Sequence, residues 1–328
     1  MGRRARTRRV ATTAALLATA MTISLAAGCT TPGEGRDDGR PPTREQDQSP
    51  EQTPTATDSV LAVKIDNIRR ARPQTGIAAA DIVYVEQVEG GLSRLMAVYA
   101  TKLPKAVGPV RSARESDLEL LRQFDEPTLA FSGAQRKLLP LIDKAPLNAQ
   151  PPGETSGAYY RGTDKPAPHN LYLRPARLLS SAPGPGALTT TGFRYGAAPS
   201  GGTADTSETV RYPAASFTFS WSESRGRWLV SQDGAPTVQT DGKRLAPATV
   251  VVQYVKIRKS DYHDSNGNYT PYTETVGSGK AKVLRDGRAY DVGWKRATPT
   301  DGTEFTTEHG SPVNFAKGQV WVVYAKAV

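Results

Sequence analysis

The 328-residue sequence predicts an α+β protein, with a mixed α/β N-terminal lobe over residues 60–180 and a mostly antiparallel β C-terminal lobe over residues 211–328. In the first lobe, short runs rich in β-branched residues alternate with a helical segment. In the second lobe, only β-rich runs occur, and turn residues separate them. Residues 181–210 between the lobes are rich in proline, glycine, serine and threonine, which predicts a linker.

The N-terminal 28 residues are typical of an export signal. Five arginines lie among the first nine residues, and an uncharged stretch, Val10–Gly28, follows them. This stretch is rich in threonine, serine and alanine, and it falls short of the ~20 strongly apolar residues that a transmembrane helix needs. We therefore predict a cleaved signal peptide over residues 1–28. General secretion is favoured, although the pair Arg8-Arg9 leaves twin-arginine export open.

A single cysteine follows the signal. The order Leu25-Ala26-Ala27-Gly28-Cys29 resembles the lipobox of bacterial lipoproteins, which implies a lipid on Cys29 and an anchor at the outer face of the cytoplasmic membrane. If Cys29 carries a lipid, the chain has no other cysteine for a disulfide, a thiol nucleophile or a metal ligand. Cysteine-dependent envelope enzymes are thereby excluded, and the membrane is an expected partner.

Residues 29–59 are predicted to be the lipidated cysteine and a disordered tether. From Thr30 to Ser59 there is no aromatic residue and no valine, isoleucine or leucine, so the segment cannot bury a core. The formal net charge of +10 falls to +5 when the five arginines of the signal are removed. Because no later run combines clustered lysine and arginine with stacking aromatic residues, nucleic acid is not an expected partner.

Two predicted strands of the N-terminal lobe, Ile82–Val88 and Leu92–Tyr99, form a hairpin around the loop Glu89–Gly91. The resulting register places Glu86 directly opposite Arg94. An ordinary cross-strand ion pair is the simpler interpretation of that position. The other elements predicted for this lobe are strands at Val60–Ile65 and Thr128–Phe131 and a short helix at Gln135–Leu139.

A helix is predicted to begin at Ala113, because Ser112 and Glu115 fit a capping box. A helix start has unpaired backbone N–H groups and the positive end of the helix dipole, and here Arg111 and Arg114 flank it. An anion would be stabilised at such a position. The alternative is that Ser112 only caps the helix and both arginines pair with carboxylates of the same lobe.

Histidine is scarce, with three residues in the chain. His263 and His309 lie in polar, glycine-rich segments that are typical of surface loops. His169 follows a loop rich in proline and glycine and is the one good candidate for acid–base chemistry. We expect no metal site and no cofactor, although carboxylates such as those of Asp66 and Glu89 could hold a hard cation.

The C-terminal lobe is predicted to be an antiparallel sheet. Asp286-Gly287 joins two β-rich runs as a hairpin, and Val320–Tyr324 is expected to close the sheet. Further strands are expected at Phe217–Trp221, Trp228–Val230 and Thr249–Ile257.

Two motifs in this lobe fail on inspection. Gly277-Ser278-Gly279-Lys280 resembles the end of a phosphate-binding loop, but Glu274 occupies the place of the first glycine and β-rich residues follow instead of a helix. Asp261–Asn268 resembles a calcium loop, but Gly267 falls one place too late for the sharp turn. We therefore expect neither nucleotide binding nor an EF-hand.

A series of short motifs after residue 59 together carries a resemblance to a bacterial family. The stretches are Lys64–Asn67, Ala71–Gly76, Ala80–Tyr84, Glu86, Val88–Arg94, Gly108–Arg114, Ser132-Gly133, Ala167–Asn170, Gly277–Ala281, Asp286-Gly287, Trp294, Gly318 and Trp321. In these stretches the chain resembles the YerB-like bacterial lipoproteins, a family defined by a domain of unknown function with N- and C-terminal parts. The resemblance extends over nearly everything after residue 59, and it implies a two-part fold and lipoprotein localisation but no established activity.

Two hypotheses of function remain open. We favour a binding lipoprotein whose polar N-lobe cleft holds an anionic or polyol envelope ligand, or a partner protein. The alternative is a hydrolase or transferase for a cell-wall or glycan substrate, with Glu86, Glu89 and His169 in acid–base roles. Arg94 or Arg111 would then stabilise negative charge. The expected ligand-binding residues are Asp66, Asn67, Arg72, Glu86, Arg94, Arg111, Ser112, Arg114, His169 and Asn170.

Overall fold

The computed structural model describes residues 59–264 and 267–327. The predicted signal peptide, Cys29 and all but the last residue of the predicted tether therefore lie outside the described residues. Within the described ranges, no helix is long and apolar enough to cross a membrane.

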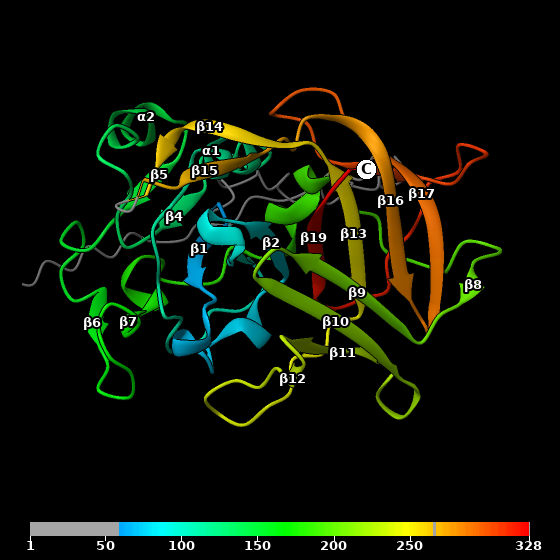
Figure 1. The fold of residues 1–328 in the computed structure, drawn as a ribbon, viewed down its shortest axis with the longest axis horizontal. Coiled ribbons are helices and arrows are strands. Elements are labelled where there is room, and N and C mark those ends of the chain that lie inside the picture. The colour runs from blue at the N-terminus through cyan, green and yellow to red at the C-terminus, as the bar shows by residue number, and fades with distance from the viewer. Residues whose placement is uncertain (1–58, 265–266, 328) are drawn as a thin grey trace, which may run out of the picture. The chain divides into compact units, whose positions relative to one another are not determined.

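A mixed eleven-stranded sheet organises the part of the chain that the structure describes (Figure 1). Its strand order is β18-β17-β16-β13-β19-β2-β3-β1-β4-β5, and β8 pairs with β17. Strands from the first and second halves of the sequence thus share one sheet. The strands are β1 Leu61–Asp66, β2 Ile82–Gln87, β3 Ser93–Tyr99, β4 Thr128–Ala130, β5 Asn148–Gln150, β8 Thr203–Ala204, β13 Thr249–Val255, β16 Gly277–Arg285, β17 Arg288–Arg296, β18 Glu304–Thr306 and β19 Val320–Lys326.

The last strand, β19, joins the two halves. It pairs in parallel with β13 on one side and with β2 on the other, through pairs such as Val322 with Tyr84. The expectation that Val320–Tyr324 would close the sheet is therefore wrong. The unbroken apolar run of β19 is typical of a strand that is buried on both faces and pairs in parallel with its neighbours. The α+β class holds only in coarse form, as a mostly β protein with mixed sheets, and the arrangement in two lobes is not confirmed.

Smaller sheets and short helices complete the described part of the chain. A four-stranded sheet contains β9 Ser207–Tyr212, β10 Ala215–Ser222, β11 Arg227–Gln232 and β12 Ala235–Pro236, and two hairpins are formed by β6 Tyr159–Arg161 with β7 Leu171–Leu173 and by β14 Ile257–His263 with β15 Tyr269–Thr273. The α-helices are α1 Glu115–Leu121 and α2 Leu139–Lys144, and the 3-10 turns are η1 Arg69–Ala71, η2 Ile77–Ala79, η3 Glu89–Gly91, η4 Pro175–Arg177, η5 Pro185–Thr191 and η6 Glu223–Arg225.

The predicted capping box of Ser112 and Glu115 is wrong. The residues before α1 are extended and hydrogen-bonded to other segments: the Arg111 N–H donates to the Lys64 carbonyl at 2.8 Å. These pairings hold the chain out of helical geometry until Glu115. The Asp117 carboxylate then accepts the backbone N–H of Arg114 at 2.6 Å and caps the helix. The short helix predicted at Gln135–Leu139 is also displaced, because α2 begins at the last residue of that range.

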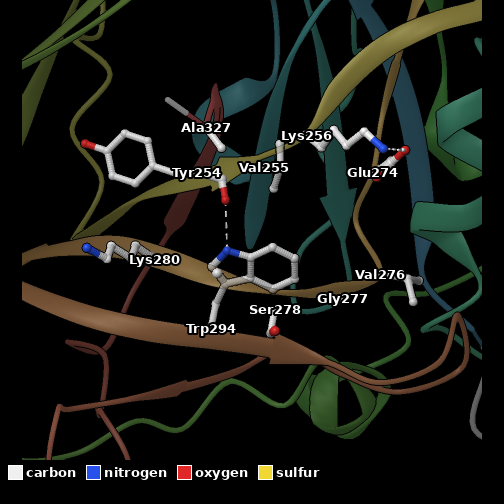
Figure 2. Close-up of a pocket in the computed structure, with 11 residues that line it drawn as sticks. Tyr254, Val255, Lys256, Glu274, Val276, Gly277, Ser278, Lys280, Trp294 and Ala327 are labelled. Carbon is white, nitrogen blue, oxygen red and sulfur yellow. Dashed lines mark hydrogen bonds and ion pairs between the residues drawn. The ribbon is translucent and has the colours of Figure 1, made fainter.

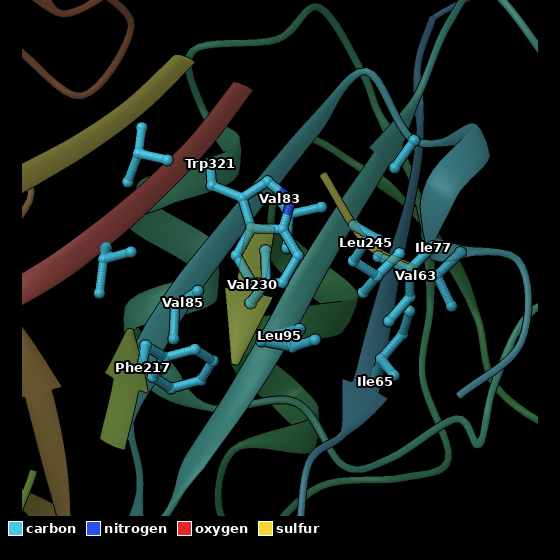
Figure 3. Close-up of a cluster of buried hydrophobic side chains, with 14 of the residues drawn as sticks. Val63, Ile65, Ile77, Val83, Val85, Leu95, Phe217, Val230, Leu245 and Trp321 are labelled. Carbon is cyan, nitrogen blue, oxygen red and sulfur yellow. The ribbon is translucent and has the colours of Figure 1, made fainter. Parts of the chain in front are cut away.

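The large sheet carries a different layer on each face. On one face, Val85 of β2 and Leu95 of β3 share a buried cluster with Phe217 and Val230 of the four-stranded sheet (Figure 3). Trp321 of β19 lies in the same cluster and is fully buried. This contact between the two sheets forms one of the buried apolar clusters of the described residues.

The other face packs on α1. Tyr84 and Met96 belong to a second buried cluster together with Leu120 and Leu121 of the helix. Because side chains alternate along a strand, the polar residues two positions farther toward the strand ends point to this same face. They are Lys64 and Asp66 of β1, Glu86 of β2 and Arg94 of β3, with Asp66 and Glu86 both in register with Arg94.

Candidate functional site

A polar cleft lies at the end of this face, and we call it the arginine cleft. Its volume is about 620 Å³, and it is formed by the end of β1, the start of β3, the segment before α1, the loop before β7 and the tip of the β14–β15 hairpin. Seven residues singled out from the sequence line it: Asp66, Glu89, Arg94, Arg111, Ser112, Arg114 and His169.

Asp66 contacts two other side chains that line the cleft. It is the last residue of β1 and is 2% exposed. Its Oδ2 lies 2.8 Å from Nδ1 of His169 and 3.4 Å from Nε of Arg111. The carboxylate therefore orients both a histidine ring and a guanidinium. The Nε2 atom of His169 makes no hydrogen bond to any residue that the structure describes, so it is available to a ligand.

Glu89 forms a two-point ion pair with Arg114. The distances are 2.6 Å from Arg114 Nε to Oε1 and 2.7 Å from Nη2 to Oε2. Burial alone would raise the pKa of Glu89, but the hydrogen bonds and charge of Arg114 outweigh it and lower the pKa below its ordinary value. Thr270 of β15 also donates to this carboxylate. Glu89 is thus held ionised, which does not suit a general acid.

Arg94 is the one guanidinium of the arginine cleft that forms no ion pair with the described residues. Its Nη1 donates to the Ser112 carbonyl at 3.0 Å, and it forms no ion pair with any carboxylate of the described residues. Burial lowers the pKa of Arg94 to about 9, and the neighbouring charges of Arg114 and Arg111 lower it as well, whereas those of Glu89 and Asp66 oppose the shift. The side chain still carries its charge at neutral pH. An enclosed cation that faces two other arginines is a place where an anion would be stabilised.

Glu86 does not line the arginine cleft. The predicted register opposite Arg94 is confirmed, but the carboxylate pairs with Lys64 of β1 and accepts a hydrogen bond from Ser116 Oγ at 2.9 Å. Lys64 also donates to Asp117 Oδ1 at 2.7 Å. Burial lowers the pKa of Lys64 to about 8, although the charge of Asp117 opposes the shift. We call Lys64, Glu86, Ser116 and Asp117 the lysine cluster.

Three other predicted ligand residues are hydrogen-bonded to other residues of the chain. Arg72 pairs with Asp233 at 2.7 Å and donates to the Asn67 carbonyl. The Asn67 side chain donates to Ser93 Oγ at 2.8 Å. The Asn170 side chain accepts from Arg161 at 2.8 Å and donates to the Gly162 carbonyl at 2.8 Å. None of the three is among the cleft-lining residues.

Sequence reasoning missed the contribution of the β14–β15 hairpin. His263 and Asp264 at its tip line the arginine cleft, although His263 was expected to be a surface loop residue. The hairpin is anchored to the same region through Tyr272, whose hydroxyl donates to Glu119 of α1 at 2.8 Å. Nothing local in the sequence indicates this contact, because it joins residues 153 positions apart.

Two family descriptions match the chain. The N-terminal domain of "Protein of unknown function (DUF3048)" matches residues 47–187, and its C-terminal domain matches residues 208–322. The chain belongs to this family. The N-terminal match contains all seven predicted residues of the arginine cleft, and the C-terminal match contributes the hairpin tip.

A named relative and a solved structure extend this result. The "Putative lipoprotein YerB" of Bacillus subtilis (strain 168) is 24% identical over 280 residues, which cover 80% of each chain. The crystal structure of the YerB protein from Bacillus subtilis matches with a TM-score of 0.66 at 20% identity, and the match covers 81% of this chain and 90% of that one. The resemblance to the YerB-like family is confirmed, and the structural match shows a shared fold.

Proposed function

We propose that this chain is an exported lipoprotein, anchored through Cys29, whose arginine cleft binds an anionic ligand of the bacterial envelope. The observation that carries the binding proposal is Arg94, an enclosed guanidinium without a carboxylate partner among the described residues. Removing a charge from water is costly unless it is paired. An anion that reaches Arg94 and Arg111 together would supply the missing partner.

The anchoring part of the proposal is supported by the N-terminal sequence and by the relative's name. An arginine-rich start, an uncharged stretch and small residues before Cys29 resemble the signal of a bacterial lipoprotein. Labelling cells with an alkyne analogue of palmitate should mark the wild-type chain and leave Cys29→Ser unmarked. Equal labelling of the two chains would contradict lipidation.

The binding part can be tested by calorimetric titration with inorganic phosphate, glycerol 3-phosphate and glucose. We expect saturable binding of the two phosphates and none of the neutral sugar. Arg94→Gln should weaken phosphate binding at least tenfold, about 1.4 kcal/mol or more. Arg72→Gln is the matched control, because Arg72 pairs with Asp233 outside the cleft. Unchanged affinity in Arg94→Gln, or tighter binding of glucose than of phosphate, would contradict the proposal.

A second candidate, hydrolysis of a cell-wall or glycan substrate, is favoured by one observation. Asp66 orients His169 at 2.8 Å and leaves Nε2 toward the cleft, as a general base requires. Release of soluble fragments from purified cell wall would then depend on His169 and disappear in His169→Gln. His309→Gln, a change at an exposed loop position, is the control. Activity that survives in His169→Gln would sink this candidate.

A further inference from the structure

A second cavity lies within the large sheet, between strands β13 and β16. Strand β16 pairs with β17 along all nine of its residues, but with β13 only from Ala281 to Arg285. Beyond the two strands, the adjoining segments meet again where the N–H of Glu274, before β16, donates to the carbonyl of Lys256, after β13, at 3.0 Å. Between these points lies an opening of about 650 Å³, which we call the sheet opening (Figure 2).

The direction of the backbone groups at the opening follows from the hairpin that joins β16 to β17. Arg285 and Arg288 flank its two-residue turn, so they form a hydrogen-bonded pair. Every second residue back along β16 then bonds to β17, and the residues between them face β13. By this alternation, the backbone groups of Ser278 and Lys280 point into the sheet opening. Ser278 has no strand partner on that side.

Trp294 explains why the ladder stops. Its Nε1 donates to the Tyr254 carbonyl at 3.0 Å, and Figure 2 shows the indole reaching this atom. That carbonyl would otherwise accept the N–H of Lys280 in the next rung. The indole passes over Gly279, where a Cβ atom would meet Nε1 at 2.8 Å. The glycine therefore admits the indole, and the indole leaves the edge of β16 exposed from Gly277 to Lys280.

The rim of the opening carries one lysine, Lys280, that is exposed and forms no ion pair within the described residues. The other lysine of the rim, Lys256, lies 3.6 Å from the carboxylate of Glu274, which also lines the opening. Lys280 is therefore the position at which a ligand carboxylate would be stabilised. A sugar platform is disfavoured, because Trp294 is only 5% exposed and its N–H is already bonded. A passing strand is also disfavoured, because both ends of the opening are closed by pairing. A chain end can enter from the open face.

We propose that the sheet opening binds the carboxyl-terminal end of an extended peptide. The peptide adds as a short strand to Ser278–Lys280, and its terminal carboxylate pairs with Lys280 at the rim. Backbone hydrogen bonds to an exposed strand edge supply affinity in this mode of recognition, and the pocket reads the end of the chain. A cavity of this size lies within the usual range of ligand sites.

The test uses the full chain in detergent and fluorescein-labelled heptapeptides that alternate glutamate with valine, isoleucine, threonine or phenylalanine. Fluorescence anisotropy should show saturable binding of at least one peptide with a free carboxyl end. Amidation of that end should weaken binding about tenfold, or 1.4 kcal/mol. Methylation of alternate backbone nitrogens should abolish it, because the peptide then lacks the N–H groups that a strand requires. The last comparison uses the unaltered protein and is independent of any folding defect.

Variants at the strand edge give a second, matched comparison. Ser278→Pro removes a backbone N–H on the side of the opening and should abolish binding, whereas Ser278→Ala removes only the side chain and should leave it unchanged. Lys280→Glu should weaken binding at least tenfold. Three results would overturn the proposal: no saturable binding of any peptide, equal binding of the methylated peptide, or displacement of the peptide by a chitin-derived tetrasaccharide.

Discussion

The arginine cleft and the lysine cluster lie on the same face of the same sheet, yet their charges are balanced differently. In the lysine cluster, one buried ammonium is shared by the carboxylates of Glu86 and Asp117, and every partner belongs to the chain. In the arginine cleft, Arg114 pairs with Glu89, whereas Arg94 forms no ion pair among the described residues and donates to a carbonyl oxygen. The carboxylates of Glu89 and Asp66 act on Arg94 only through their charge. A buried charge with partners inside the chain stabilises the fold, whereas a buried charge without such partners can bind a ligand.

The largest effect is expected in the lysine cluster. Lys64→Met leaves two buried carboxylates without their common cation, and we expect a loss of about 3–5 kcal/mol in the free energy of unfolding. Urea denaturation measures it. Ser116→Ala, which removes one hydrogen bond to Glu86, should cost only about 1–2 kcal/mol. A loss below 1 kcal/mol in Lys64→Met would remove the distinction between the two regions.

The lysine cluster should also make stability depend on pH on the alkaline side. Burial lowers the pKa of Lys64 from 10.5 to about 8, so between these values the unfolded chain binds more protons than the folded one. This residue therefore makes the free energy of unfolding rise as the pH increases through that window, by about 3 kcal/mol at most. The rise should be absent in Lys64→Met. Identical pH profiles for the two proteins would contradict the assignment.

The sequence predicts contacts between residues that are close along the chain better than contacts between residues that are far apart. The β2–β3 hairpin and its Glu86–Arg94 register were predictable because a three-residue loop fixes the pairing locally. Six of the ten residues expected to bind a ligand line the arginine cleft, as does Glu89, which was expected in an acid–base role. That these residues bind a ligand stays a prediction. The partners Lys64 of Glu86 and Asp233 of Arg72 were missed, since the fold alone brings them together. The position of β19 was missed for the same reason.

In the arginine cleft, removing a charge should cost little stability. Arg94→Gln deletes a cation that forms no ion pair within residues 59–264 and 267–327, so we expect a change of less than about 1 kcal/mol in the free energy of unfolding, of either sign. The same variant should lose phosphate binding. A stability loss of several kcal/mol measured by urea denaturation would indicate that Arg94 serves the fold, as Lys64 does.

A small effect on stability, confined to acidic pH, is expected at Glu89. Its pKa is lowered in the folded protein, so its contribution to stability is present above the unfolded pKa near 4.5 and is lost as the pH falls through the folded value. Glu89→Gln should therefore flatten the acid side of the stability profile by about 1 kcal/mol. It should also strengthen phosphate binding, because Arg114 loses its internal partner. Weaker phosphate binding in this variant would contradict the proposed competition.

If the arginine cleft is an anion site, a bound anion can be located in it by crystallography. Crystals of the protein soaked in selenate, a heavy analogue of sulfate, would give an anomalous difference map that marks each bound anion. We expect an anomalous peak within about 4 Å of the guanidinium of Arg94, the separation at which charged groups pair. This peak should be absent in Arg94→Gln crystals. Selenate peaks elsewhere on the surface with an empty arginine cleft would contradict the proposed anion site.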